Sequence, residues 1–203
     1  IKYTKADEET NLYEIENTSS KFFSSYIMSD IDLPIVVYQK GKYVLKGGFW
    51  DGRIEVNSTI DYNNPNIKDE KISYCTFPNK DDPVVVMEMP KNEKFLLCGT
   101  KKGFLIGYLV NAQNLEMQYK QYNHNDEITS IFISDTLNMF ATASKDGLIM
   151  IHILPSFKLV RTIQISSNFN EDFVYADNIF LSSTPLPCIT IYISSKKLFK
   201  TYT

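Results

Sequence analysis

The sequence predicts an all-β repeat fold, a partial β-propeller of about three and a half four-stranded blades. The strongest indication is a recurring frame, in which an apolar strand, a polar residue followed by glycine and a second apolar strand return along the chain. The glycines of this frame are Gly52, Gly103 and Gly147, which stand 51 and then 44 residues apart, as expected of propeller blades. A second indication is residue choice, because β-branched and aromatic residues dominate and Gly or Pro repeatedly interrupts the apolar runs, which disfavours helices.

Residues 1–34 are expected to be a lead-in segment, weakly structured or part of an adjoining blade. They lack a sustained hydrophobic period. Residues 1–30 contain six acidic residues and three lysines, and this difference accounts for the net charge of -3 of the whole chain. An open array of blades leaves an apolar flank at each end. About three and a half blades are half of a typical propeller of four to eight, so we expect segments not in this sequence to close the ring, either elsewhere in the parent chain or lost from between the given segments.

Residues 35–203 are expected to form the blades. In the first blade the Asp51-Gly52 pair stands between two apolar runs, which is a strong hairpin signal. The strands assigned to this blade are 35–38, 43–45 and 53–58, and the polar stretch 61–71 is assigned to a loop.

The next two blades contain continuous apolar runs, typical of strands that are covered on both faces. The runs of the second blade are 84–87, 95–98, 104–110 and 117–122, and those of the third are 128–133, 139–143, 148–153 and 159–165. A fourth, partial blade contains 179–181, 189–193 and 198–202, with a turn at Lys196-Lys197.

The composition argues against several classes of function. The 21 basic residues are balanced by 24 acidic ones and include only two arginines, Arg53 and Arg161, so no nucleic-acid partner is expected. Cys75, Cys98 and Cys188 are an odd set at unrelated spacings, which indicates reduced thiols. No apolar run approaches the roughly 20 residues of a membrane span. We expect a cytoplasmic protein that associates at most peripherally with vesicle or organelle membranes.

No catalytic, cofactor or metal site is expected. His124 and His152 are the only histidines, and no arrangement of them with Ser or Cys gives a nucleophile, a base and an orienting acid. No Cys or His pair has metal-ligand spacing. Asp51 and Asp146 leave open a pair of glycosidase carboxylates, but each directly precedes Gly at the same place in the frame, which a turn explains without chemistry.

The stretch from Asn123 to Thr129, followed by Ser144 to Gly147, resembles a WD40 repeat. In WD40 blades a loop His, a turn Asp and a Ser or Thr on the second strand form a buried hydrogen-bond network that ends on a Trp of the third strand. The resemblance implies the following structural residues: Asp51, Gly52, His124, Ser144 or Thr142, Asp146, Gly147, and His152 at the Trp position.

The other blades depart from this pattern. The first has Asn57 at the Trp position, and the second has Lys102 for the Asp and Tyr108 for the Trp. We therefore expect a complete network in the third blade at most.

Three further segments together resemble the C-terminal WD40 region of BEACH-domain proteins, the neurobeachin and lysosomal-trafficking-regulator group. They are Gly48 to Asp51, Leu154 to Arg161, and Phe180 to Pro187, and the resemblance covers about residues 35–203. It implies a non-enzymatic scaffold in membrane trafficking that binds protein partners through its loop rims and contacts adjoining domains of the same parent chain. The alternative is a structural WD40 subunit of a large stable assembly.

Trp50 is the candidate partner-binding residue. It aligns with Lys101 and Lys145 at the tip of the turn between the second and third strands, and Trp is enriched among interface hot spots. The alternative is that Trp50 folds back over its own blade or an adjoining domain. Lys101-Lys102 and Lys196-Lys197 fit solvated turns, with a lipid headgroup site as their alternative.

Overall fold

The computed structural model describes residues 3–5, 13–15, 34–58, 73–111, 114–165, 174–184 and 186–203. These residues form β-strands and one 3₁₀ turn, η1 (Ser194–Lys196), with no α-helix among them. None of the elements in these ranges is a helix long and apolar enough to cross a membrane. Within the predicted lead-in segment, β1 (Tyr3–Lys5) and β2 (Tyr13–Ile15) pair antiparallel; the rest of that segment and the predicted loop 61–71 lie outside the described residues.

Four antiparallel sheets follow, and in each the spatial order of strands is the chain order. The first blade consists of β3 (Ile35–Tyr38), β4 (Tyr43–Lys46), β5 (Ile54–Ser58) and β6 (Ser73–Thr76). The second consists of β7 (Val84–Glu88), β8 (Phe95–Thr100), β9 (Phe104–Asn111) and β10 (Asn114–Tyr122). The third consists of β11 (Ile128–Ser134), β12 (Met139–Ser144), β13 (Leu148–Ile153) and β14 (Lys158–Gln164). The fourth has only β15 (Asn178–Ser182), β16 (Cys188–Ile193) and β17 (Leu198–Tyr202).

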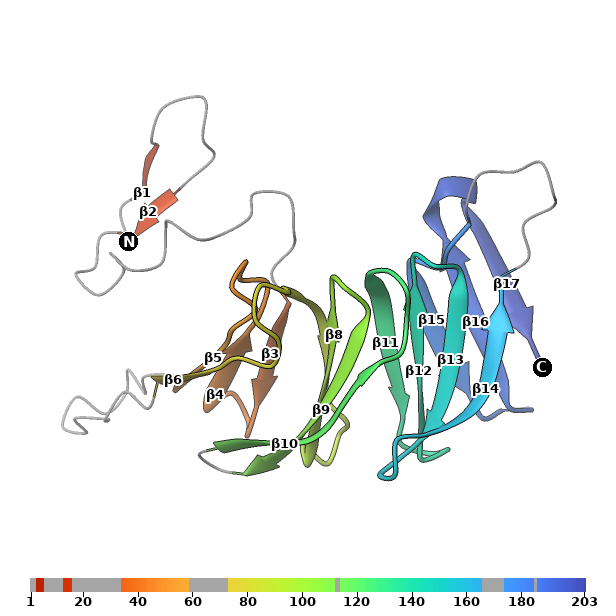
Figure 1. Ribbon diagram of the computed structural model, residues 1–203, viewed down its shortest axis with the longest axis horizontal. Coiled ribbons are helices and arrows are strands. Elements are labelled where there is room, and N and C mark those ends of the chain that lie inside the picture. The colour runs from red at the N-terminus through yellow and green to blue at the C-terminus, as the bar shows by residue number, and fades with distance from the viewer. Residues whose placement is uncertain are drawn as a thin grey trace.

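The sheets stand side by side in chain order as an open array (Figure 1), with the first strand of each blade next to the first strand of its neighbour. This confirms the predicted all-β partial propeller, whose ring these residues do not close. One strand differs from the prediction. The sequence predicts three strands in the first blade, whereas β6 completes it as a fourth. The short run that forms β6 follows a long polar stretch and carries little apolar signal of its own.

Each inner sheet buries both of its faces. On β8, Leu96 belongs to the core between the first and second blades, whereas its neighbour Leu97 belongs to the core between the second and third; both are fully buried. On β9, Ile106 and Leu105 divide in the same way. Successive side chains of a strand point to opposite faces of the sheet. Since both faces are buried here, adjacent residues such as these must both be apolar, which gives continuous apolar runs.

An aromatic side chain of the third blade packs against the second blade. Phe157, in the turn between β13 and β14, is 7% exposed and stacks on Tyr119 of β10 with ring centroids 4.7 Å apart. Its ring also covers Gly107 of β9, where a Cβ would lie 2.5 Å from Phe157 Cε1. Glycine is therefore needed at position 107 because the ring of the neighbouring blade occupies the space of a side chain.

Gly107→Ala is expected to lower the free energy of unfolding by about 1–3 kcal/mol, the usual cost of overpacking a filled core. Urea denaturation measures it. Phe157→Leu, which shortens the intruding side chain, should remove most of that cost in the double variant. An equal cost of Gly107→Ala in both backgrounds would show that the ring does not impose the glycine.

Candidate interaction surface

One end of the array is built from the same turn in every blade, at the upper edge of the sheets in Figure 1. We call this end, formed by residues 47–53, 77–83, 101–103, 123–127, 145–147 and 194–197, the turn rim. In each blade the main-chain N–H of the fourth turn residue donates to the carbonyl of the first. These bonds join Gly52 to Phe49, Gly103 to Thr100, Gly147 to Ser144 and Lys197 to Ser194, at 2.9–3.2 Å.

The turn glycines satisfy two constraints at once. Gly52 and Gly103 have φ of +78° and +89°, a region that L-residues with side chains rarely adopt. A Cβ at Gly52 would also collide with the main-chain oxygen of Asn79, and one at Gly103 with that of His124. Each turn is thus pressed against the loop that leads to the next blade.

Those loops connect successive turns. In the loop 77–83, the Asp81 N–H donates to the carbonyl of Asp51 in the first blade at 3.3 Å. The carboxylate of Asp82 accepts the N–H of Lys102 in the second blade at 2.9 Å. The loop 123–127 repeats the arrangement between the second and third blades. Hydrogen bonds therefore link the turn rim across the first three blades.

His124 is the centre of a buried network in the third blade. Its Nδ1 lies 3.2 Å from Asp146 Oδ2 and its Nε2 lies 2.8 Å from Thr142 Oγ1. A carboxylate only accepts hydrogen bonds, so Nδ1 carries the proton and Nε2 accepts from the Thr142 hydroxyl. Burial lowers the pKa of His124 more than the nearby Asp146 raises it. Asp146 also accepts the N–H groups of Asn125 and Leu148, both at 2.9 Å.

Ser144 stands beside this network and not within it. Its hydroxyl donates to the Asp126 carbonyl at 3.0 Å and accepts the Asp146 N–H at 3.1 Å. Of the two residues that the resemblance implies, Thr142 is thus the one whose side chain contacts His124. Gly147 closes the turn.

His152 is fully buried but bonds elsewhere than the WD40 resemblance implies. It stacks on Phe140 with ring centroids 4.8 Å apart, and its Nε2 lies 3.0 Å from Asn123 Nδ2. Burial, with a smaller contribution from the nearby His124, lowers the pKa of His152 to about 4. Its Nδ1 lacks a well-formed hydrogen bond.

Asp82 and Asn123 take part in hydrogen-bond networks that the sequence pattern does not predict. Lys102 replaces the turn Asp of the second blade, and the fully buried Asp82 supplies a carboxylate to that turn from the preceding loop. A signal existed, because Asp82 and Asp126 both stand two residues before the first strand of a blade.

Asp51 is held within its own turn. Its Oδ2 accepts Arg53 Nη1 at 2.7 Å and its Oδ1 accepts the Arg53 N–H at 3.2 Å. The guanidinium also bonds Glu55 at 2.9 Å and lies 3.9 Å from the centre of the Phe49 ring. Asp51 and Asp146 belong to the first and third blades and both are engaged in turn hydrogen bonds. Both carboxylates that the glycosidase alternative names are therefore engaged by their own turns.

Trp50 lies at the tip of the first-blade turn with 46% of its surface exposed. Lys101 occupies the equivalent tip of the second blade. Lys145, at the tip of the third, forms an ion pair with Glu127 at 3.0 Å. The turn rim therefore presents an aromatic tip beside a charged one.

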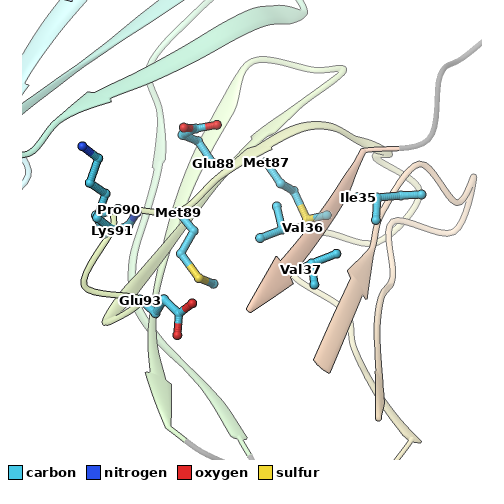
Figure 2. A pocket seen from close by; sticks show the side chains of 9 residues that line it. All are labelled: Ile35, Val36, Val37, Met87, Glu88, Met89, Pro90, Lys91 and Glu93. Carbon is cyan, nitrogen blue, oxygen red and sulfur yellow. The ribbon is translucent and has the colours of Figure 1, made fainter. Parts of the chain in front are cut away.

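A cleft of about 380 Å³ opens at the opposite end of the blades, between β3 and β7. Figure 2 shows Met87 extending toward Val36 across it, and Met89 beside Glu93. The carboxylate of Glu93 accepts the Gln39 N–H at 3.0 Å, which joins the turns of the first two blades. In the described part of the chain, His, Cys, Asp and Glu side chains form no group of three suited to a metal ion.

Solved structures with this architecture include U3-55K, with a TM-score of 0.60 at 14% identity over 86% of this chain and 53% of that chain. The RRP9 WD40 repeats give 0.59 at 14%, over 86% and 52% of the two chains. The fold is that of a WD40-type propeller. The β-propeller domain of Myceliophteria thermophila Cps50 (Swd1) gives 0.62 at 13%, over 83% and 50%. The chain thus spans about half the length of these WD40-type structures. No protein-family model and no curated protein sequence matches it.

Acidification is expected to destabilise this WD40-type segment through His152. The unfolded histidine takes up a proton near pH 6.5, whereas the folded one has a pKa of about 4. Between those values the unfolded state binds more protons, so the free energy of unfolding falls as the pH falls through this window. The loss from this group is about 2 kcal/mol at pH 5.

Urea unfolding at pH 7.5 and pH 5 measures this effect. His152→Phe keeps an aromatic ring against Phe140 and retains His124, so it should lose less stability than the wild type between the two pH values. Equal losses in the two proteins would contradict the assignment.

Proposed function

We propose that this chain is a non-enzymatic interaction scaffold that presents the turn rim to protein partners. The observation that carries the proposal is the construction of that rim. The connecting loops 77–83 and 123–127 each hydrogen-bond to the turns of two successive blades, so these two loops have little conformational entropy left to lose on binding. The fold is compatible with this role, since WD40-type structures place their loops on a rigid β-scaffold.

Trp50 is the proposed contact residue. A half-exposed Trp at the tip of a braced turn offers a large apolar area at low entropic cost. The neighbouring Phe49 is 2% exposed and lies under Arg53, which anchors the turn that carries Trp50.

The resemblance of three segments to the WD40 region of BEACH-domain proteins supports a finer proposal. The parent protein would be a large cytoplasmic scaffold in vesicle and membrane trafficking, associated with membranes through partners or adjoining domains. Within this chain, Phe157 of the second of those segments is the residue that locks two blades together, a structural role independent of any particular pathway.

A specific observation favours a second candidate, a subunit of a stable assembly whose open flanks are covered by a neighbouring chain. Ile35 and Val37 of the first blade are 55% and 57% exposed, and Phe199 of the fourth is 65% exposed. Fully covered blades would bury such side chains. Finding the remaining blades on another polypeptide would favour this candidate, and finding them in the same gene product would favour the first.

Trp50→Ala is expected to weaken partner binding without unfolding the blade. Truncating a hot-spot Trp costs about 2 kcal/mol or more, which is about thirtyfold in affinity. Quantitative affinity capture with the wild type and the variant, alongside their melting temperatures, tests this.

Leu159→Ala is the matched control, since Leu159 is equally exposed at 47% but lies on an outermost strand, β14. Loss of at least one partner by Trp50→Ala alone, at an unchanged melting temperature, supports the proposal. Equal loss of stability and binding, or no partner lost, would contradict it.

A further inference from the structure

Exposed aromatic and basic side chains gather where the turn rim passes from the first blade to the second. Trp50 and Phe77 are 46% and 58% exposed, and Phe77 directly follows β6. Four exposed lysines share this region. We call the set the aromatic–lysine patch, formed by Trp50, Phe77, Lys80, Lys101, Lys102 and Lys120.

Hydrogen bonds connect the elements that carry the patch. The loop 77–83 bonds the turn of Trp50 through Asp81 and the turn of Lys101 and Lys102 through Asp82. Lys120 reaches the same loop from β10, since its Nζ donates to the Pro78 carbonyl at 2.7 Å. All six side chains therefore belong to one loop and the elements bonded to it.

Positive charge is in excess among the exposed side chains of the patch, with four lysines against the carboxylate of Asp81. Across the described ranges, no carboxylate forms an ion pair with the four patch lysines. Asp81 is the exposed carboxylate of this loop, whereas the carboxylate of Asp82 is buried and that of Asp51 is held by Arg53. The contrast is the equivalent tip of the third blade, where Lys145 is paired with Glu127.

We infer that the partner of the turn rim presents an acidic peptide segment with an apolar anchor, in which Asp or Glu residues flank a large apolar side chain. The inference rests on the proposed function and adds the chemistry of the ligand. Trp50 and Phe77 supply apolar area for the anchor, and the lysines supply complementary charge.

The patch offers point charges and no free arginine. The bidentate fork of arginine matches both carboxylate and phosphate groups. Arg53 is the arginine near this site, and its guanidinium is engaged by Asp51, Glu55 and the Phe49 ring. Lysines act as point charges that accept a carboxylate in many geometries.

A phage-displayed library of random heptapeptides, selected on the intact chain, tests the inference. Selected peptides should carry net negative charge and at least one large apolar residue. The affinity of a selected peptide, measured by fluorescence anisotropy, should fall about tenfold in the double variant Lys101→Gln, Lys102→Gln, since two exposed charge contacts are together equivalent to about that factor. It should also weaken as salt is raised.

Lys91→Gln with Lys94→Gln is the matched control, because both lysines are exposed and lie in the turn between β7 and β8, at the opposite end of the second blade. It removes the same charge and should leave peptide affinity unchanged. Peptides that depend on Trp50 but not on Lys101 and Lys102 would overturn the acidic partner and leave the proposed function standing. Selection of neutral or basic peptides, equal effects of the two double variants, or binding to phosphatidylserine vesicles without any selected acidic peptide would each overturn the inference.

Discussion

The coverage of both faces of every inner sheet is the constraint on which the remaining structure depends. Leu96 and Leu97 are adjacent on β8 and both fully buried, yet they belong to different cores. Each blade is therefore half of two cores, and neither face can be completed by the blade alone. The same constraint explains the exposed Ile35 and Phe199 at the two flanks, where the described array ends.

Close packing of blades brings their connections into contact, and this produces the turn rim. A loop that leaves one blade must pass the turn of that blade before it enters the next, which brings main-chain groups together in a crowded space. The polar groups buried there find partners in the loops, as Asp146 and His124 do. Hydrogen bonds order these loops in advance, so binding at the rim would cost little conformational entropy.

Local sequence signals predicted most of the fold, because they report on strands and turns. The runs of the second and third blades, the Asp51-Gly52 and Asp146-Gly147 turns and the three strands of the fourth blade lie where the pattern placed them. The strand β6 was missed because its short run carries little apolar contrast. The contact of Phe157 with Gly107 joins residues far apart in the sequence, and a single sequence holds no signal of such a pairing. The role of Asp82 was missed because its carboxylate reaches the second-blade turn from the preceding loop. The WD40 pattern places the carboxylate within the turn, where this chain has Lys102.

Native-state hydrogen exchange resolved by strand tests most directly whether coverage of both sheet faces stabilises this array. We expect the slowest amide exchange in β8, β9, β11 and β12, which are covered by a blade on each side, and faster exchange in β3 and β17 of the two end blades. Uniform protection across the four blades, or faster exchange in β8 and β9 than in β17, would contradict it.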